Sequence, residues 1–331
     1  MSHKQSIEFL REYLEPKGYL FETLNLGMKK TEYTFIQSLD NGDRLTLSSN
    51  NPLYPFTTSS ARLIAKDKLM SYDLMRHIGI KSPKTVVIKK TDTEREDARR
   101  LMKECLSVVV KPFDRAGSNG LTLDIHDLSD LDTAITKALE NSNTALVQEQ
   151  FIGEEVRFVV IDGLVKGAIL RQKPRVIGDG NLNISQLIEL ENDNRSSLVG
   201  MTVQYPKLTE DNINKSILQD KRIPAQGETI ELNKSTMISG GASIYNILNT
   251  IESSYVQIAE KVAARMGRGF VVIDMMIKDY KDPATDSNYV FIEMNLAPAI
   301  ALFYSCRDGK HFKVVEDYLG PMLENILNKE R

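Results

Sequence analysis

The chain has 331 residues, of which 41% are hydrophobic and 26% charged, and its formal net charge at pH 7 is −3. This composition is typical of a globular protein with two or three lobes, and the absence of a basic block disfavours general nucleic-acid binding. Two cysteines, Cys105 and Cys306, are too few for a disulfide framework, and no apolar run reaches the roughly 18 residues of a membrane span. We therefore expect a cytoplasmic protein without a signal peptide and with no nucleic-acid or membrane partner.

The first 62 residues are predicted to form a small α/β lobe. A helix is expected over residues 2–18, and the segments YTFIQSL and RLTLSS flank an Asn-Gly dipeptide, which is a strong signal for a tight hairpin turn. Residues 61–80 have helical periodicity and end at Gly79, so one continuous helix is expected there.

From residue 84 onward, strands and helices mix without strict alternation, which predicts the α+β class. Further strands are expected at 84–88, within 107–125, at 144–152, at 156–173 with a turn at Asp162-Gly163, at 268–279 and at 287–295. Further helices are expected at 94–105, 128–141, 249–267 and the C-terminus. The stretch 183–220 is polar and partly helical, and 233–246 is expected to be a Gly/Ser loop.

Polar side chains interrupt two strands that are otherwise apolar. Glu293 and Asn295 are two residues apart in YVFIEMN and therefore point to one face, and Asp274 interrupts FVVIDMMI. A carboxylate in apolar surroundings costs several kcal/mol unless a positive charge answers it. Three oxygen ligands on two strands suit a hard cation such as Mg²⁺; the alternative is a set of polar strand ends.

Lys111 ends the apolar strand VVVKP, and the segment DRAGSNG follows it. Loops rich in Gly, Ser and Asn offer backbone N–H groups to phosphate oxygens, although this one matches neither the P-loop nor the dinucleotide motif. The alternative for Lys111 is a side chain that extends to solvent.

Arg171, Lys173 and Arg175 alternate along GAILRQKPRV, so a continuous strand would place them on one face. Such a face can bind phosphate or carboxylate groups. It can equally belong to a solvated edge strand, where basic side chains prevent aggregation.

In VQEQFIGEEVRF, the acidic residues Glu149, Glu154 and Glu155 surround a Phe-Ile-Gly corner. One interpretation is charged surface. The other is a hinge whose backbone hydrogen-bonds an adenine edge, with a carboxylate on the ribose hydroxyls.

The motifs occur in the order VVVKPF…GSNG, VQEQFIGEEVRFVVIDG, VIGDGNLNISQLIELEN, SGGASI and VVIDMMIKD…YVFIEMNLAPAI. In this order, over residues 60–310, the chain resembles an ATP-grasp domain. Within that superfamily it is most similar to the ATP-grasp part of cyanophycin synthetase and the glutathione-synthetase half of the bifunctional glutathione enzyme. The resemblance implies an α+β ATP-grasp fold with two α/β subdomains that clamp ATP. It implies an N-terminal lobe at 1–62, a subdomain with the phosphate loop at 63–145, and a subdomain with hinge, substrate loops and metal site at 146–331.

The resemblance also implies roles for individual residues. The nucleotide phosphates would contact Lys68 and Lys111 beneath the loop residues Gly117, Ser118, Asn119 and Gly120. The adenine hinge would be Glu149, Gln150, Phe151 and Ile152, with Glu155 on the ribose. Arg171 would lie near the transferred phosphoryl group and, with Lys111, would be catalytic. Mg²⁺, expected as two ions and with Mn²⁺ as the alternative, would bind Asp274, Glu293 and Asn295.

The reaction implied by the resemblance is ATP-dependent ligation of a carboxylate to an amine. Two small amino-acid-like substrates would be joined by a peptide or amide bond through an acyl phosphate, with release of ADP and phosphate. The alternatives are an ATP-grasp phosphotransferase and a non-catalytic nucleotide-binding regulator. The partners would be the carboxylate and amine substrates, and a homodimer is the expected assembly.

The chain also departs from its relatives. Asn233 and Lys234 stand where the relatives carry an Arg-rich segment, and Arg115 stands where they often have Gly. These departures leave ATP use expected and weaken the expectation that glutathione or cyanophycin is the product. The segments DRAGSNG and NKSTMISGGASI are candidate lids, and Cys306 is expected to be a packed thiol rather than a nucleophile.

Overall fold

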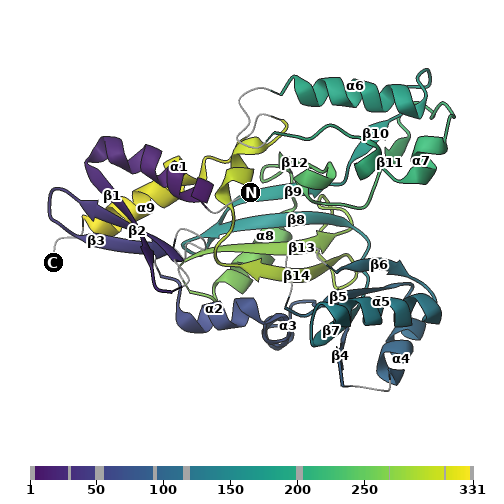
Figure 1. Cartoon of the computed structure of the whole chain (residues 1–331), viewed down its shortest axis with the longest axis horizontal. Helices are drawn as coiled ribbons and strands as arrows, with labels where there is room; N and C mark the ends of the chain where they lie inside the picture. Colours follow the sequence, from purple (N-terminus) through teal and green to yellow (C-terminus); the bar gives the residue numbers. More distant parts are fainter. Residues whose placement is uncertain are drawn as a thin grey trace.

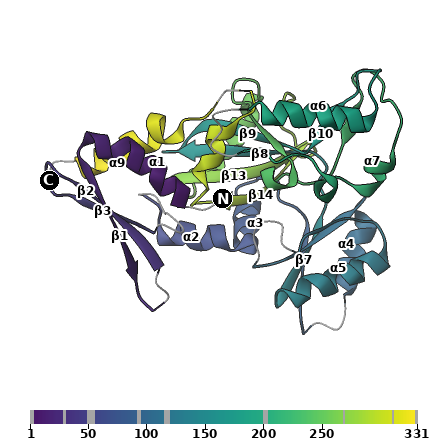
Figure 2. The same cartoon turned by 45° about the horizontal axis from the view of Figure 1, so that its top comes forward.

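The computed structural model describes residues 4–28, 31–48, 56–91, 95–114, 120–198, 204–267, 269–308 and 311–328. In this part of the chain, strands form a three-stranded, a four-stranded and a five-stranded sheet and a separate two-stranded pair. The five-stranded sheet lies in the middle, between the three-stranded and the four-stranded sheets (Figures 1 and 2). The mixture of helices and strands confirms the predicted α+β class. Within the described residues, no helix is long and apolar enough to cross a membrane.

The N-terminal lobe packs one helix against the three-stranded antiparallel sheet (Figure 1). Its elements are α1 (Lys4–Leu14), a 3₁₀ turn (Glu15–Lys17), β1 (Tyr19–Leu26), β2 (Thr31–Ser38) and β3 (Arg44–Ser48). The predicted hairpin between β2 and β3 is confirmed. Strand β1 was not predicted, because most of its residues are exposed and the alternation of a half-buried strand is weak in it.

Two short helices replace the single helix predicted for residues 61–80. Helix α2 (Ser59–Lys66) is separated from α3 (Lys68–His77) by Asp67, whose backbone is extended. The Asp67 side chain accepts hydrogen bonds from two N–H groups in the first turn of α3 and thereby caps it. The break makes Lys68 the first residue of a helix.

The four-stranded sheet has the order β4-β7-β5-β6, and all its pairs are antiparallel. Its strands are β4 (Thr85–Lys89), β5 (Val108–Pro112), β6 (Thr122–Ile125) and β7 (Thr144–Glu149). Helices α4 (Glu96–Glu104) and α5 (Leu128–Glu140) pack against it. Opposite β5, strand β6 contains one extra residue, and Asp124 at this bulge has a φ of 54°.

The five-stranded sheet has the order β12-β9-β8-β13-β14 and is antiparallel throughout. Its strands are β8 (Glu154–Ile161), β9 (Leu164–Gln172), β12 (Ser243–Asn246), β13 (Phe270–Ile277) and β14 (Tyr289–Asn295). The predicted turn at Asp162-Gly163 is confirmed, and both residues have positive φ. Helix α8 (Ser253–Ala263) covers one face. Part of the opposite face packs against the N-terminal lobe and the C-terminal segment.

Two predictions for this region are wrong. Residues 243–246, expected to be part of a loop, form β12 at the edge of the sheet, because their backbone pairs with β9. Strand β9 lies between β12 and β8, so the edge-strand interpretation of its basic residues fails. That strand also ends at Gln172, and Arg175 begins a different strand.

A segment between β9 and β12 stands apart from the sheet (Figure 1). It contains β10 (Arg175–Ile177) paired with β11 (Thr229–Glu231), together with α6 (Ile184–Ser196) and α7 (Lys215–Gln219). Short 3₁₀ turns span Glu210–Asn212 and Ile238–Gly240. The segment has its own small apolar core, so it folds as a unit on the edge of the sheet.

The C-terminal segment returns to the N-terminal lobe. It contains a 3₁₀ helix (Ile300–Ser305), a π-helical turn (Val315–Leu319) and α9 (Gly320–Leu327), which packs against α1. Cys306 is fully buried here, and burial raises the pKa of its thiol to about 12. A thiol in this environment is not a thiolate at neutral pH, so Cys306 is unsuited to nucleophilic attack.

The core between the five-stranded sheet and α8 can be tested by a substitution at Phe158, whose ring is fully buried there. We expect Phe158→Ala to lower the free energy of unfolding by about 3–5 kcal/mol, because the change removes a packed ring and leaves a cavity. The control Leu164→Ala, at a half-exposed position of β9, should change it by less than about 0.5 kcal/mol. Urea unfolding followed by circular dichroism measures both variants. Equal stability of the two would contradict this core.

Candidate functional site

The charged residues of the five-stranded sheet lie on one of its faces. The register places Asp274 directly opposite both Arg157 and Glu293, because β13 lies between β8 and β14. Side chains directly opposite each other, or two residues apart on a strand, point to the same face. The shared face therefore carries Glu155, Arg157, Arg171, Asp274, Glu293 and Asn295.

Arg157 and Asp274 form a bidentate ion pair. The Arg157 Nε donates to Asp274 Oδ1 at 2.7 Å, and its Nη2 donates to Oδ2 at 2.6 Å. The two side chains are only 12% and 3% exposed. Burial alone would lower the pKa of Arg157, but the charge and hydrogen bonds of Asp274 raise it above its ordinary value. Arg157 therefore remains charged inside the protein.

Arg157 is the functional residue that sequence analysis missed. Sequence analysis predicted that the carboxylates in the apolar strands need a positive partner, and it assigned that role to Mg²⁺ alone. The structure supplies a guanidinium to Asp274 from the neighbouring strand. A signal was available, because Arg157 interrupts an apolar strand two residues after Glu155 and therefore shares its face.

Glu293 lies among charges of both signs, which act on its pKa in opposite directions. Burial and the neighbouring Asp274 carboxylate raise its pKa, whereas Lys111, Lys68 and Arg157 act in the opposite direction. Burial lowers the pKa of Lys111 to about 8, and the Glu293 charge partly opposes this shift. Carboxylates and cations thus sit close enough to determine one another's protonation.

The two predicted phosphate-binding lysines reach the carboxylates from the side of the four-stranded sheet. Lys111 projects from β5, and its Nζ lies 3.5 Å from the hydroxyl of Tyr72. That hydroxyl donates to the Ile292 carbonyl of β14 at 3.1 Å, which ties α3 to the strand of Glu293. Lys68, at the start of α3, donates to the Phe113 carbonyl at 3.3 Å. The structure therefore brings Lys68 and Lys111 together with Glu293.

The predicted adenine hinge is the link between the two large sheets. Residues 150–153 connect the end of β7 to the start of β8. A Cβ on Gly153 would lie 2.5 Å from the Ile277 carbonyl oxygen, so this close approach requires glycine. Ile152 is 62% exposed, and its backbone N–H has no hydrogen-bond partner within the described residues. This group is available to a ligand.

Arg171 and Glu155 are held together. They are directly opposite each other, and Arg171 Nη1 lies 2.5 Å from Glu155 Oε1. Lys173 and Arg175 do not join them, since the two residues pair instead with Glu231 and Glu154. Only Arg171 of the three basic residues thus belongs to the shared face, and the roles predicted for Arg171 and Glu155 stay predictions.

One residue of the predicted phosphate loop can be placed. Gly120 has a φ of 78°, and a Cβ on it would lie 2.7 Å from Pro112 Cγ, so both its conformation and its surroundings favour glycine. Gly117, Ser118 and Asn119, like Arg115, lie outside the described residues.

The carboxylate pair fits a divalent cation. Asp274 and Glu293 offer hard oxygen ligands side by side, and their repulsion contributes to the raised pKa of Glu293. Asn295 shares their face, and its amide oxygen accepts a hydrogen bond from the Ala297 N–H at 3.0 Å. Three or more His, Cys, Asp or Glu side chains do not converge on a metal site anywhere in the described residues. The remaining ligands would therefore come from an amide, water or phosphate.

Sequence comparisons relate the chain to known proteins. No family model matches the chain. It is 29% identical over 266 residues to the glutathione biosynthesis bifunctional protein GshAB of Clostridium perfringens, an alignment that covers 78% of this chain and 34% of that protein. It is 24% identical over 273 residues to the cyanophycin synthetase of Trichormus variabilis, covering 81% and 30% respectively.

The structural comparison covers nearly the whole chain. A crystal structure of a bifunctional glutathione synthetase from Pasteurella multocida superposes with a TM-score of 0.63 at 20% identity, over 99% of this chain and 44% of that one. The chain has the ATP-grasp fold. The predicted resemblance to these ATP-grasp ligases is confirmed. The chain spans less than half the length of each of these relatives.

The ion pair of this ATP-grasp chain can be tested by its effect on stability. We expect Arg157→Gln to lower the free energy of unfolding by about 3–5 kcal/mol at neutral pH, because it leaves a buried carboxylate without its partner. The loss should shrink as the pH falls, since the unpaired carboxylates then bind protons in the folded state. The double variant Arg157→Gln/Asp274→Asn should recover most of the loss. Urea unfolding at two pH values, with EDTA, measures this; a pH-independent loss would contradict the assignment.

A second prediction concerns Glu293, whose replacement should stabilise the protein rather than destabilise it. Its raised pKa means that the folded protein binds this proton more tightly than the unfolded chain. Glu293 therefore lowers stability above its folded pKa, and the cost vanishes as the pH falls to the unfolded value of about 4.3. We expect Glu293→Gln to stabilise the metal-free protein by on the order of 1 kcal/mol at neutral pH and to leave it unchanged near pH 4. Thermal unfolding at both pH values checks this, and destabilisation at neutral pH would refute it.

Proposed function

We propose that this chain is an ATP-dependent carboxylate–amine ligase that joins two small amino-acid-like substrates through an amide bond. One observation carries the proposal: Lys68 and Lys111 approach the buried Asp274 and the half-buried Glu293 from the side of the other large sheet. Cations on one side and carboxylates on the other suit a metal-bound triphosphate, because the lysines contact phosphate oxygens and the carboxylates bind the metal. The ligases among its relatives support the same class.

The nucleotide base would lie at the link between the sheets. The N–H of Ile152, which has no partner in the part of the chain that the structure describes, can donate to an adenine nitrogen, and the exposed Ile152 side chain offers apolar contact. The phosphates would extend toward Lys68 and Lys111, beneath the loop that ends at Gly120. This direction leads from the hinge to the carboxylates along β8.

Asp274, Glu293 and Asn295 would hold Mg²⁺, expected as two ions, which when bound neutralises phosphate charge. Arg157 has a distinct task in this arrangement. Its two hydrogen bonds fix the orientation of both Asp274 carboxylate oxygens. The chain thus presents a rigid acceptor to the metal rather than a free side chain.

The chemistry requires two successive steps, a phosphoryl transfer to the carboxylate and then an acyl transfer to the amine. The carboxylate of the first substrate attacks the γ-phosphorus of ATP, so an acyl phosphate forms and ADP leaves. The amine of the second substrate then attacks the acyl carbon, loses a proton, and phosphate leaves. Arg171 would lie beside the transferred group, and the protein supplies position and charge rather than a covalent nucleophile. The buried thiol of Cys306 agrees with this.

A phosphate-release assay separates ligation from its alternatives. We expect inorganic phosphate only when ATP, Mg²⁺, a carboxylic acid and an amine are all present, because the acyl phosphate is released by the amine. Glu293→Gln should reduce this rate about 100-fold or more, because it removes a metal-binding carboxylate. A phosphotransferase would instead form ADP without free phosphate, and a regulator would bind ATP without turnover.

Binding is measured separately from turnover. Millimolar Mg-ATP should raise the melting temperature of the parent chain by about 2–4 °C, as any ligand of the native state does. Leu164→Ala serves as the control, since this half-exposed residue lies on a hairpin turn at the start of β9. Parental phosphate release by Glu293→Gln would remove the metal assignment, and the absence of any melting shift would remove the nucleotide site.

A further inference from the structure

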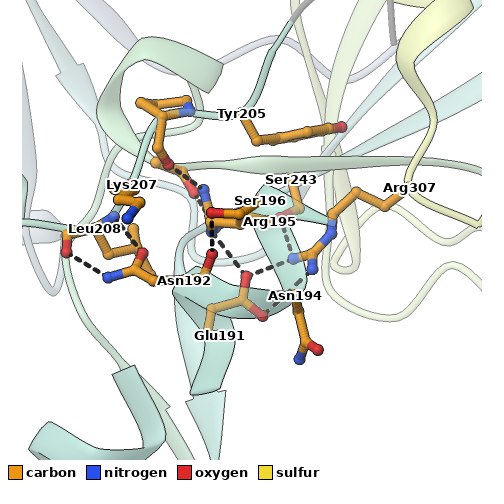
Figure 3. Close-up of polar contacts among 12 residues, drawn as sticks. Glu191, Asn192, Asn194, Arg195, Ser196, Tyr205, Lys207, Leu208, Ser243 and Arg307 are labelled. Carbon is orange, nitrogen blue, oxygen red and sulfur yellow. Dashed lines mark hydrogen bonds and ion pairs between the residues drawn. The ribbon is translucent and has the colours of Figure 1, made fainter. Parts of the chain in front are cut away.

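The loop of residues 233–242, which joins β11 to β12, is held firmly at its C-terminal end. Arg195 of α6 is only 3% exposed and donates to the Gly241 carbonyl at 2.7 Å and to Glu191 at 2.8 Å (Figure 3). Arg307 of the C-terminal segment binds the same Glu191 carboxylate at 2.5 Å and the hydroxyl of Ser243 at 3.1 Å. If Gly241 moved away, the buried Arg195 guanidinium would lose this hydrogen bond. This end of the loop is therefore fixed.

The N-terminal end of the same loop is held differently. The ammonium of Lys234 pairs with the Oδ2 atom of Asp124 in β6, so the loop is joined to the four-stranded sheet. The Lys234 side chain is 53% exposed. Exposed ion pairs are weak and break readily in water. The C-terminal end of the loop is therefore held by buried contacts, whereas the contact that joins the loop to the four-stranded sheet is exposed and reversible.

The backbone conformation and hydrogen bonds of Asp124 hold its carboxylate in position beside Lys234. It sits at the bulge of β6 with a φ of 54°, a conformation that few residues other than glycine adopt and that asparagine and aspartate tolerate best. The side chain of Gln150 accepts from the Asp124 N–H and donates to its Oδ1, both at 2.7 Å. These two bonds fix one carboxylate oxygen and leave the other to Lys234.

Gln150 belongs to the link between the two large sheets, where the adenine hinge is predicted. Its backbone N–H donates to the Ser107 carbonyl at 3.1 Å, so the residue is anchored to the four-stranded sheet as well. A chain of contacts thus runs from the hinge through Gln150, Asp124 and Lys234 to the loop.

We propose that Asp124 is a positioning residue that couples the nucleotide hinge to the 233–242 loop. The inference rests on the proposed function, because a nucleotide at residues 149–152 would contact Gln150 and stabilise its hydrogen bonds. Gln150 holds the Asp124 carboxylate, and that carboxylate pairs with Lys234 of the loop. A bound nucleotide therefore strengthens the contact that holds the 233–242 loop against the four-stranded sheet.

Hydrogen–deuterium exchange of the loop tests the coupling. In the parent chain we expect Mg-ADP to slow amide exchange across 233–242 about two- to fivefold, in line with one exposed ion pair. Asp124→Asn keeps the backbone conformation and the Gln150 bonds but removes the charge, and it should abolish this slowing. Lys234→Met should do the same, and Lys234→Arg should restore it. The matched control Arg222→Met breaks exposed ion pairs to Asp220 and Glu228 within the same segment and should retain the parental response.

The outcomes separate this inference from the proposed function. Circular dichroism verifies the fold of each variant, and Lys234→Met, at an exposed position, keeps the test open if Asp124→Asn does not fold. Nucleotide binding without a nucleotide-dependent response in Asp124→Asn and Lys234→Met supports the coupling. A parental response in both variants overturns it and leaves the ligase proposal intact. A parent chain that shows no melting shift with Mg-ADP overturns both.

Discussion

Two like charges held side by side dominate this structure. Asp274 and Glu293 are directly opposite each other on adjacent strands, where Cβ atoms lie roughly 5 Å apart. Two like unit charges about 5 Å apart repel by about 3 kcal/mol at an effective dielectric constant of 20. Arg157, Lys111 and Lys68 offset this repulsion. The positive charges around the carboxylates are therefore needed by the fold itself, before any ligand is present.

The same charges constrain the geometry of the sheet. The bidentate contact between Arg157 and Asp274 exists in only one register of β8 on β13, because a slip of one residue would turn Arg157 into the apolar core beneath α8. Strand β8 begins directly after the link of residues 150–153. Fixing the register therefore also fixes the distance along β8 from the link of residues 150–153 to the carboxylates.

Local sequence predicted the elements whose signals are local. The Asn-Gly and Asp-Gly turns, the strands around Asp274 and Glu293, and the shared face of Glu293 and Asn295 all follow from spacing. The missed features depend on distant partners. Strand β12 exists because β9 lies beside it, and Arg157 gains its role only from Asp274, which is 117 residues away. At Asp67, periodicity alone does not show whether one helix continues or whether Asp67 caps a second helix.

Two of the three departures that the sequence shows, Asn233 and Lys234, lie at the start of the 233–242 loop, whereas Arg115 lies outside the described residues. Asn233 and Lys234 stand where an Arg-rich segment is expected, and both make contacts that hold the loop that they begin. The Asn233 amide donates to the Gly240 carbonyl at 2.9 Å, and Lys234 pairs with Asp124. Lys68, Lys111, Asp274 and Glu293, by contrast, match the pattern that is expected for ATP use. Under the proposed ligase function, a change in the contacts of the loop would leave ATP use intact and alter the substrates, so substrate identity should be sought around residues 233–242.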